Sequence, residues 1–258
     1  MKKKYKFNFT NKNIVITGGI GNLGEYLSTA FLNLNANVII VDKTINKKKN
    51  VNKKLKFFKV DLSNFSEIKL FYKQLRKKKI SIDCLINNAT YNHTGVSKKY
   101  IGKINDQDEL VFKNVIDVNL VAPFILSKYL SKLMSKAEDP NIINVSSIYS
   151  NLAPDFRIYN NTTMGNSAAY SSSKSGLNQL TRWLASNLAP KIRVNSISPG
   201  GIQKFQKNIF VKKYKSKVLL NKMAKEDDIV GPILFLASNI ASYITGENLT
   251  VDGGYSSV

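Results

Sequence analysis

The stretch Ile14-Val15-Ile16-Thr17-Gly18-Gly19-Ile20-Gly21-Asn22-Leu23-Gly24 decides the fold of this 258-residue chain. An apolar run leads into a glycine-rich turn, and apolar residues then recur with helical spacing, which predicts a strand, a tight turn and a helix. The glycines at 19, 21 and 24 follow the G-x-G-x-x-G spacing, which lets a backbone approach a pyrophosphate at a helix amino terminus. An ordinary strand-to-helix turn is the alternative, but the flanking strand and helix are the context that a dinucleotide site needs.

Short apolar stretches alternate with longer helical patterns along the rest of the chain. This alternation predicts an α/β fold, a doubly wound parallel sheet of the Rossmann type with helices on both faces, in three α/β/α layers. The length fits a single domain over 1–258. Beyond the first strand we expect strands at 37–41, 55–60, 82–86, 141–145, 192–197 and 248–251, and helices around 64–79, 107–136, 168–188 and 227–238.

Polar residues and glycines gather where the predicted strands end, at the sheet edge where such folds bind ligands. Asp42 ends the second strand and stands where a carboxylate accepts hydrogen bonds from the adenosine ribose, which favours NAD over NADP. A solvated loop charge is the alternative for Asp42. Lys43 and the lysines at 47–49 leave open the attraction of a 2′-phosphate, although a lysine run in a loop is usually only solvated.

Tyr170 and Lys174 stand four residues apart in AAYSSSKSG, so that a helix places both on one face. A free tyrosine is a poor base at neutral pH, and an adjacent ammonium group stabilises its phenolate. The pair therefore predicts acid/base chemistry. A surface tyrosine beside a surface lysine is the alternative, because this chain is rich in both residue types.

Taken in order, these motifs resemble the short-chain dehydrogenase/reductase family, classical type, over nearly all of the chain. The resemblance rests on the glycine turn, Asp61 in VDLS, Asn87-Asn88-Ala89, Asn119 in DVNL, Ser147 in NVSS, Tyr170-x-x-x-Lys174, Asn195-x-x-x-Pro199-Gly200, and Thr245-Gly246 to Asp252-Gly253-Gly254. It implies an NAD(P)-dependent oxidoreductase that interconverts a secondary alcohol and a ketone.

The resemblance also implies roles for individual residues. Tyr170 would exchange the substrate proton while hydride moves between the substrate carbon and the nicotinamide, and Ser147 would hold the substrate oxygen. Lys174 would lower the Tyr170 pKa and bind the nicotinamide ribose, and Asn119 would hold a water that relays protons. The expected cofactor contacts are Thr17, Gly18, Gly19, Gly21, Asn22, Leu23, Gly24, Asp42, Asp61, Leu62, Asn88, Ala89, Tyr170, Lys174, Pro199, Gly200 and Ile202.

Some positions depart from the family pattern. Asn22 stands in place of a middle glycine, and we expect it to tolerate a left-handed backbone. Thr90 replaces a glycine, and Lys204 stands where a threonine often supports the nicotinamide amide. An extra loop at about 148–168 separates Ser147 from Tyr170 and is expected beside the substrate.

The extra loop carries the hypothesis about the substrate. Its Arg157 has a planar fork that suits a phosphate or carboxylate, although a plain surface arginine is an equal alternative. The loop and the sequence through 182–185 look similar to dehydrogenases of flagellin and surface-glycan modification. A phosphorylated or nucleotide-linked sugar is therefore the hypothesis for the small-molecule substrate.

The formal net charge of +22 raises a basic nucleic-acid-binding protein as an alternative function. The lysines are spread along the chain without an aromatic-interleaved basic motif, so no specific nucleic-acid partner is expected. A catalytically silent cofactor-binding regulator is a second alternative, which the complete Asn/Ser/Tyr/Lys set argues against.

Composition points to a cytoplasmic enzyme. The single cysteine, Cys84, is expected in the core, and the single histidine, His93, in a loop, so no metal site is predicted. The sequence shows neither a run of about 18 apolar residues nor a signal-peptide pattern, so no membrane partner is expected. The resemblance implies a homo-oligomer, a tetramer or dimer, packed through the helices at 107–136 and 168–188.

Overall fold

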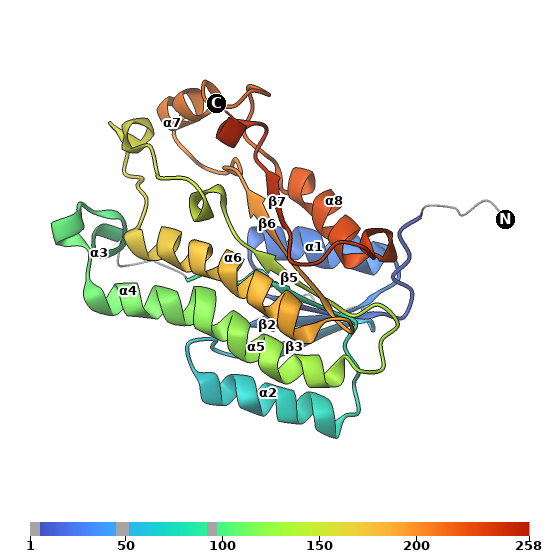
Figure 1. Cartoon of the computed structure of the whole chain (residues 1–258). Helices are drawn as coiled ribbons and strands as arrows, with labels where there is room; N and C mark the ends of the chain where they lie inside the picture. The colour runs from blue at the N-terminus through green and yellow to red at the C-terminus, as the bar shows by residue number, and fades with distance from the viewer. Residues whose placement is uncertain (1–5, 45–51, 92–96, 258) are drawn as a thin grey trace.

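The computed structural model describes residues 6–44, 52–91 and 97–257. Its centre is one sheet of seven parallel strands in the order β3-β2-β1-β4-β5-β6-β7, which confirms the predicted doubly wound fold (Figure 1). The strands are β1 Asn13–Thr17, β2 Asn37–Asp42, β3 Leu55–Lys59, β4 Cys84–Asn87, β5 Asn141–Val145, β6 Arg193–Pro199 and β7 Asn248–Val251.

Both faces of the sheet are buried under helices, as the uninterrupted apolar strands require. In β1, Ile14 and Ile16 pack toward α1 and α8, whereas Val15 packs toward α2, α5 and α6. This alternation is the period of two that a strand imposes on its side chains. The helices are α1 Asn22–Asn33, α2 Phe65–Lys77, α3 Ser97–Ile101, α4 Glu109–Ile116, α5 Ala122–Leu130, α6 Ala168–Leu188, α7 Asn208–Lys215 and α8 Glu226–Ala237.

Several helices begin at polar residues that cap their free backbone N–H groups. The side chains of Asn64, Asp108 and Ser167 each accept a hydrogen bond from the first turn of α2, α4 and α6. Ser167 therefore fixes where α6 begins, and α6 carries the Tyr170-Lys174 pair. Cys84 is buried in the core, as predicted, and burial raises the pKa of its thiol.

The helix expected at 107–136 is divided in the structure. A π-helical turn at Asp117–Val121 separates α4 from α5, and Asn119 lies within it. Single π turns interrupt the regular hydrogen-bond ladder and are frequent at functional sites.

The segment Glu109–Leu133 includes α4, the π-helical turn and α5. An 18-residue window of this 25-residue segment has a mean hydropathy of 1.5, enough by length and composition alone for a membrane span. In the fold it contributes Val115, Leu126 and Leu130 to the core, and a core helix satisfies the same criterion. Its outer face still exposes Leu110, with 64% of its surface accessible.

A third apolar cluster lies outside the sheet and was not predicted. It joins the extra loop to α7, through residues that include Ile158, Phe210 and Tyr214. We refer to residues 148–168 and 200–225 together as the cap. Figure 1 shows both parts on the same side of the molecule, above the amino-terminal end of α6.

Candidate active site

The glycine turn after β1 is built from backbone atoms in contact. Gly18 has a φ of +64°, and an added Cβ there would lie 2.8 Å from the Ala89 Cα atom. A Cβ on Gly24 would lie 2.2 Å from the Gly18 carbonyl oxygen and 2.7 Å from the Gly19 Cα atom. Side chains are thus excluded at positions 18 and 24, and α1 packs directly on the turn.

The amino terminus of α1 fits the pyrophosphate of a dinucleotide. Gly21 is its N-cap residue, and no side chain caps the first-turn N–H groups. Such N–H groups and the helix dipole favour a phosphate. The described structure thus offers a compact turn and an uncapped helix start where the G-x-G-x-x-G spacing predicted them.

Asn22 does not have the left-handed backbone that the sequence analysis expected. It is the first residue of α1, and Gly18 is the residue of the turn with positive φ. The Asn22 amide donates a 3.3 Å hydrogen bond to Glu226, at the start of α8. The residue therefore connects two helices without backbone strain, and Leu23 packs beside it against the core.

Asp42 ends β2 beside the glycine turn. Its carboxylate accepts a 3.2 Å hydrogen bond from the backbone N–H of Ile20. Asp61 follows β3 and forms a 2.8 Å ion pair with Lys43. Burial raises the pKa of Asp61, but hydrogen bonds from Lys43 and Ser63 outweigh it and leave that pKa lowered. Lys43 is therefore engaged by a carboxylate, and the lysines at 47–49 lie outside the described residues.

The segment after β4, which contains Asn88 and Ala89, is hydrogen-bonded to the glycine turn. The Thr17 hydroxyl accepts 3.0 Å hydrogen bonds from the backbone N–H groups of Asn88 and Ala89. The Asn88 amide donates to the carbonyl oxygens of Thr17 and Gly18. Leu62 is buried in the core next to this edge. His93 follows the segment but lies outside the described residues.

Ser147, Tyr170 and Lys174 come together at the carboxyl end of β5. Ser147 is buried, and its hydroxyl forms a hydrogen bond with the Tyr170 phenol. The Lys174 ammonium group lies 5.7 Å from the centre of the Tyr170 ring and donates a 2.7 Å hydrogen bond to the Val145 carbonyl. Lys174 is only 3% exposed, so it is not a surface lysine.

The charges of this pair differ from the expectation. Burial raises the pKa of Tyr170, and the hydrogen bond from Ser147 only opposes that rise. Burial also lowers the pKa of Lys174 to about 8. The expected lowering of the Tyr170 pKa by Lys174 is wrong for this structure, because removal from water disfavours phenolate and ammonium alike.

The Asn119 side chain is occupied by protein groups. Its oxygen accepts hydrogen bonds from the Tyr91 N–H at 2.8 Å and the Thr90 hydroxyl at 3.3 Å, and its nitrogen donates to Ser173 at 3.1 Å. Asn119 therefore joins the segment after β4 to α6. Thr90, a departure from the family pattern, has a bonding role that the sequence analysis missed. The residue stands just after the Asn-Asn-Ala motif, and its position was the only signal.

The strand end after β6 completes the edge. A Cβ on Gly200 would meet the Asp252 Cα atom at 2.9 Å, and the Gly201 N–H donates to the Tyr214 hydroxyl. Pro199 ends β6, and Ile202 pairs by a single bridge with Ala224. The residues predicted around the nicotinamide thus share the edge that holds the glycine turn.

Arg157 does not have the free guanidinium that the phosphate-clamp hypothesis requires. Its fork binds both carboxylate oxygens of Asp155, at 2.8 and 2.9 Å, and its side chain is 82% exposed. Asp155 also forms an ion pair with Lys217. The arginine therefore belongs to the surface of the cap.

Among the described residues, no group of three or more His, Cys, Asp or Glu side chains is placed to hold a metal ion. The chemistry of this edge is that of a buried phenol, hydroxyl and amine beside a dinucleotide-type turn. Such a set is chemically able to exchange protons with a substrate oxygen.

Comparisons with known proteins agree with this geometry. Residues 19–256 match a family model described as enoyl-(acyl carrier protein) reductase. A Leptospira borgpetersenii short-chain dehydrogenase with bound NAD+ superposes with a TM-score of 0.88 at 34% identity, over 96% of this chain and 94% of that one.

The chain belongs to the short-chain dehydrogenase/reductase family. It is an oxidoreductase. The post-translational flagellin modification protein A of Campylobacter coli is 33% identical, over 95% of this chain and 98% of that protein. The 3-oxoacyl-(acyl-carrier-protein) reductase FabG of Buchnera aphidicola is 32% identical, over 94% of this chain and 96% of that protein.

Proposed function

We propose that this enzyme is an NAD-dependent dehydrogenase that interconverts a secondary alcohol and a ketone with Tyr170 as its acid/base. The observation that carries the proposal is the buried cluster of Ser147, Tyr170 and Lys174 on the edge that also holds the glycine turn. A buried phenol bonded to a serine hydroxyl and close to an amine suits proton exchange with a substrate oxygen.

Each residue of the cluster has a part in the reaction. NAD, when bound, takes up the hydride in oxidation and returns it in reduction. In reduction, the protonated Tyr170 phenol, which its raised pKa favours, donates its proton to the ketone oxygen and becomes a phenolate. In oxidation, the phenolate takes the hydroxyl proton of the alcohol. Ser147 holds the substrate oxygen by a hydrogen bond. Lys174 passes the proton onward, a task that its pKa of about 8 suits. Asn119 fixes the segment after β4 against α6.

NAD is favoured over NADP by the charges beside the turn. The Asp42 carboxylate lies beside the glycine turn, where it would accept hydrogen bonds from ribose hydroxyls and would repel a 2′-phosphate. Lys43 is held by Asp61, which leaves it less available to such a phosphate. Pro199, Gly200 and Ile202 then lie beside the nicotinamide.

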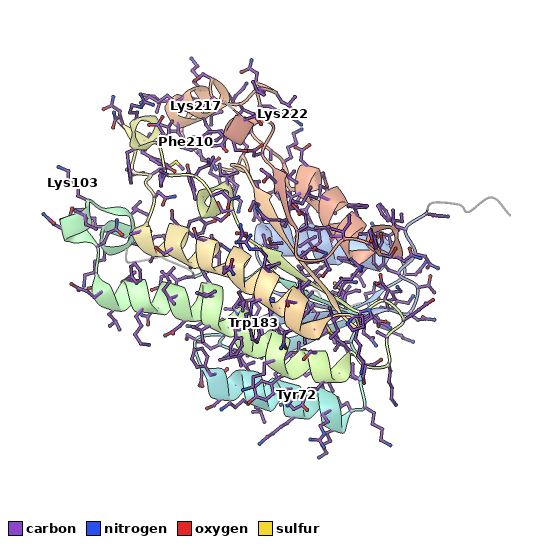
Figure 2. All side chains as sticks on the ribbon, viewed as in Figure 1. Tyr72, Lys103, Trp183, Phe210, Lys217 and Lys222 are labelled. Carbon is purple, nitrogen blue, oxygen red and sulfur yellow. The ribbon has the colours of Figure 1, made fainter. Side chains whose placement is uncertain are left out.

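The cap favours an anionic substrate. Residues 200–225 include eight lysines and no aspartate or glutamate. Within the described part of the chain, ion pairs engage only Lys217 and Lys222 of these eight. Figure 2 shows Lys217 and Lys222 near α7, with Lys103 at the end near α3. A basic rim attracts phosphate-bearing molecules, which supports a phosphorylated or nucleotide-linked sugar.

An acyl group on an acidic carrier protein is a second candidate substrate. It is favoured by the similarity to the 3-oxoacyl-(acyl-carrier-protein) reductase FabG, and it would meet the same basic rim. The sugar hypothesis is favoured by the flagellin modification relative and by the phenols that line the cap.

The outer faces of α4, α5 and α6 fit a homo-oligomer of this cytoplasmic enzyme, a tetramer or dimer. Leu110, Phe112 and Phe124 lie exposed on the first two helices, and Trp183 is 54% exposed on α6. These apolar side chains come from helices that Figure 1 shows next to one another. Exposed apolar surface of this kind marks protein contacts. Light scattering on the wild-type enzyme and on Trp183→Glu would test this assembly.

The function is tested by following reduced-nicotinamide absorbance while NAD is offered with hexose phosphates, nucleotide sugars, 3-hydroxyacyl thioesters and simple polyols. Tyr170→Phe serves as the inactive control. Turnover of a sugar that the variant loses would support the proposal. Turnover of thioesters alone would replace the sugar with an acyl substrate.

Two results would contradict the proposed activity. NADH binding without any turnover would indicate the catalytically silent regulator. Salt-sensitive DNA binding without turnover would indicate the nucleic-acid alternative.

A further inference from the structure

The extra loop is fastened to α7 by three kinds of contact. The Lys213 ammonium group donates hydrogen bonds to the carbonyl oxygens of Arg157 and Asn160, at 3.3 and 2.9 Å. Asp155 is paired with Lys217. The Tyr159 ring stacks on Phe210, with ring centres 5.6 Å apart. The loop and α7 are therefore held together as one wall, and Figure 2 labels Phe210 within it.

This wall connects the two ends of the proposed reaction site. The Tyr149 N–H donates to the Ser147 hydroxyl, and the Tyr149 and Tyr159 hydroxyls lie 2.8 Å apart. Beyond Phe210, Tyr214 continues the row of rings and accepts a hydrogen bond from the Gly201 N–H. A continuous path of contacts thus runs from the serine that binds the substrate oxygen to the strand end beside the nicotinamide.

The phenol of Tyr159 is connected to the reaction site through Tyr149, which bonds to both Tyr159 and Ser147. Its oxygen interacts electrostatically with the Tyr170 phenol and forms a hydrogen bond with Asn166. Burial raises the pKa of Tyr149 and of Tyr159, so both hydroxyls keep their protons at neutral pH.

The bond between Tyr149 and Tyr159 uses one of their two protons. Tyr149 also has a hydrogen bond with Tyr255, so three hydroxyls share two bonds and one O–H is left over. When Tyr255 donates to Tyr149 and Tyr149 donates to Tyr159, that free O–H belongs to Tyr159 and can donate to another oxygen.

We propose that Tyr159 is a specificity-determining residue, which binds a second oxygen of the substrate, a hydroxyl on a carbon next to the reacting one. Tyr149 is its positioning residue and acts through the shared hydrogen bond. This assignment rests on the proposed function, because it takes Ser147 and Tyr170 as the groups that hold the reacting oxygen.

The chemistry of the wall favours a neutral oxygen over a carboxylate at this position. The nearby groups on the wall are protonated phenols and the Asn166 amide, and Asp155 holds the guanidinium group of Arg157. Of the lysines of α7, Lys212 is exposed, and Lys213 is bonded to carbonyl oxygens of the extra loop. The structure thus separates a neutral hydroxyl-binding wall from a basic rim, as a sugar with an anionic group requires.

The experiment compares a vicinal cyclohexanediol with cyclohexanol, which lacks the second hydroxyl. Binding of each to the NADH-bound enzyme is measured by the change in NADH fluorescence, and oxidation of each is measured with NAD. The wild-type enzyme should prefer the diol by about fivefold, the worth of one neutral hydrogen bond. Tyr159→Phe should abolish that preference and leave cyclohexanol unaffected.

The single variant Tyr149→Phe and the double variant Tyr149→Phe/Tyr159→Phe complete a double-mutant cycle with Tyr159→Phe. Because Tyr149 acts through Tyr159, we expect the double variant to bind the diol no more weakly than Tyr159→Phe alone. Tyr243→Phe is the matched control, because that phenol is fully exposed and lies outside the cap. Thermal unfolding of all variants shows whether a substitution destabilises the fold. A purely structural role of Tyr159 would weaken the binding of both ligands alike.

Each outcome decides the matter. Equal loss of diol and cyclohexanol binding in Tyr159→Phe, or no preference for the diol in the wild-type enzyme, would overturn the assignment of Tyr159. Loss of the diol preference in Tyr159→Phe without turnover of either alcohol by the wild-type enzyme would keep the assignment and reject the proposed function.

Discussion

The glycine-turn edge and the cap are built by different means. At the turn, backbone packs closely on backbone, because a Cβ added at Gly24 would lie only 2.2 Å from the Gly18 carbonyl oxygen. In the cap, rings stack and long side chains bridge segments more than fifty residues apart, as Lys213 does with Arg157. A site made by backbone tolerates few residue types, whereas a site made by side chains tolerates many. The glycine turn can therefore be predicted from its sequence motif, whereas the cap cannot.

The first prediction concerns Tyr170, which lies between the glycine turn and the cap. Tyr170→Phe should lower turnover by about a thousandfold, because the variant keeps the ring but has no hydroxyl to exchange the proton. The dissociation constant of NADH, measured by fluorescence, should stay within about twofold of the wild-type value. Retention of most of the wild-type rate would remove Tyr170 from its assigned role.

Gly24→Ala tests the backbone-built region. The added methyl would press on the Gly18 oxygen and shift the turn, so NADH affinity should fall by about two orders of magnitude. Calorimetric titration with NADH checks this. Gly231→Ala is the matched control, because an added Cβ in that helical position meets no atom within 4 Å. The control should bind NADH normally and unfold at a slightly higher temperature. Equal NADH affinity in both variants would show that close backbone packing at Gly24 does not matter.

The pH dependence of folding stability tests whether Lys174 is a buried amine. Its pKa is lowered to about 8 in the folded protein from an ordinary 10.5, so the unfolded chain binds more protons between those values. The folded state therefore gains stability as pH rises through that window, by about 2 kcal/mol between pH 7 and about pH 9.5. Lys174→Met should lack this gain.

Urea unfolding of both proteins at the two pH values measures the difference. Other groups titrate equally in the two proteins and cancel in the comparison. A parallel pH response of the wild-type protein and Lys174→Met would show that Lys174 is not a buried amine.

The smallest effect on enzyme kinetics is expected from removal of the ion pairs of the cap. Asp155→Asn removes the charge that holds Arg157 and Lys217, but the stacked rings remain. Exposed ion pairs contribute little, so KM should rise by about twofold with kcat and NADH affinity unchanged. Steady-state kinetics check this, with the exposed Glu138→Gln variant as control. A large fall in NADH affinity would mean that the cap and the turn are not separate regions.

Sequence patterns predicted most of the fold and the position of the site. The apolar runs of β1 and β2 and the helical pattern of α6 are local signals, and the structure places these elements as expected. Burial was harder to predict, because it depends on the surrounding fold. The opposite pKa shifts of Tyr170 and Lys174 arise from that burial, not from their spacing of four residues.

Side-chain contacts of the site and cap residues were also not predicted from the sequence, because such contacts depend on the surrounding fold. Arg157 looked available for a phosphate, but its fork is held by Asp155. Asn22 looked like a strained turn residue, but it begins a helix and binds Glu226, 204 positions further along the chain. Helix α7 has few local signals, and its place is set by Phe210 and Tyr214 packing on the extra loop.

A crystal structure of the enzyme with NADH tests the central claim most directly. We predict that the adenosine ribose hydroxyls bond to the Asp42 carboxylate, that the pyrophosphate lies at the start of α1, and that the nicotinamide lies between Gly200 and Tyr170. A nicotinamide far from the Tyr170 hydroxyl, or a ribose turned away from Asp42, would contradict the account.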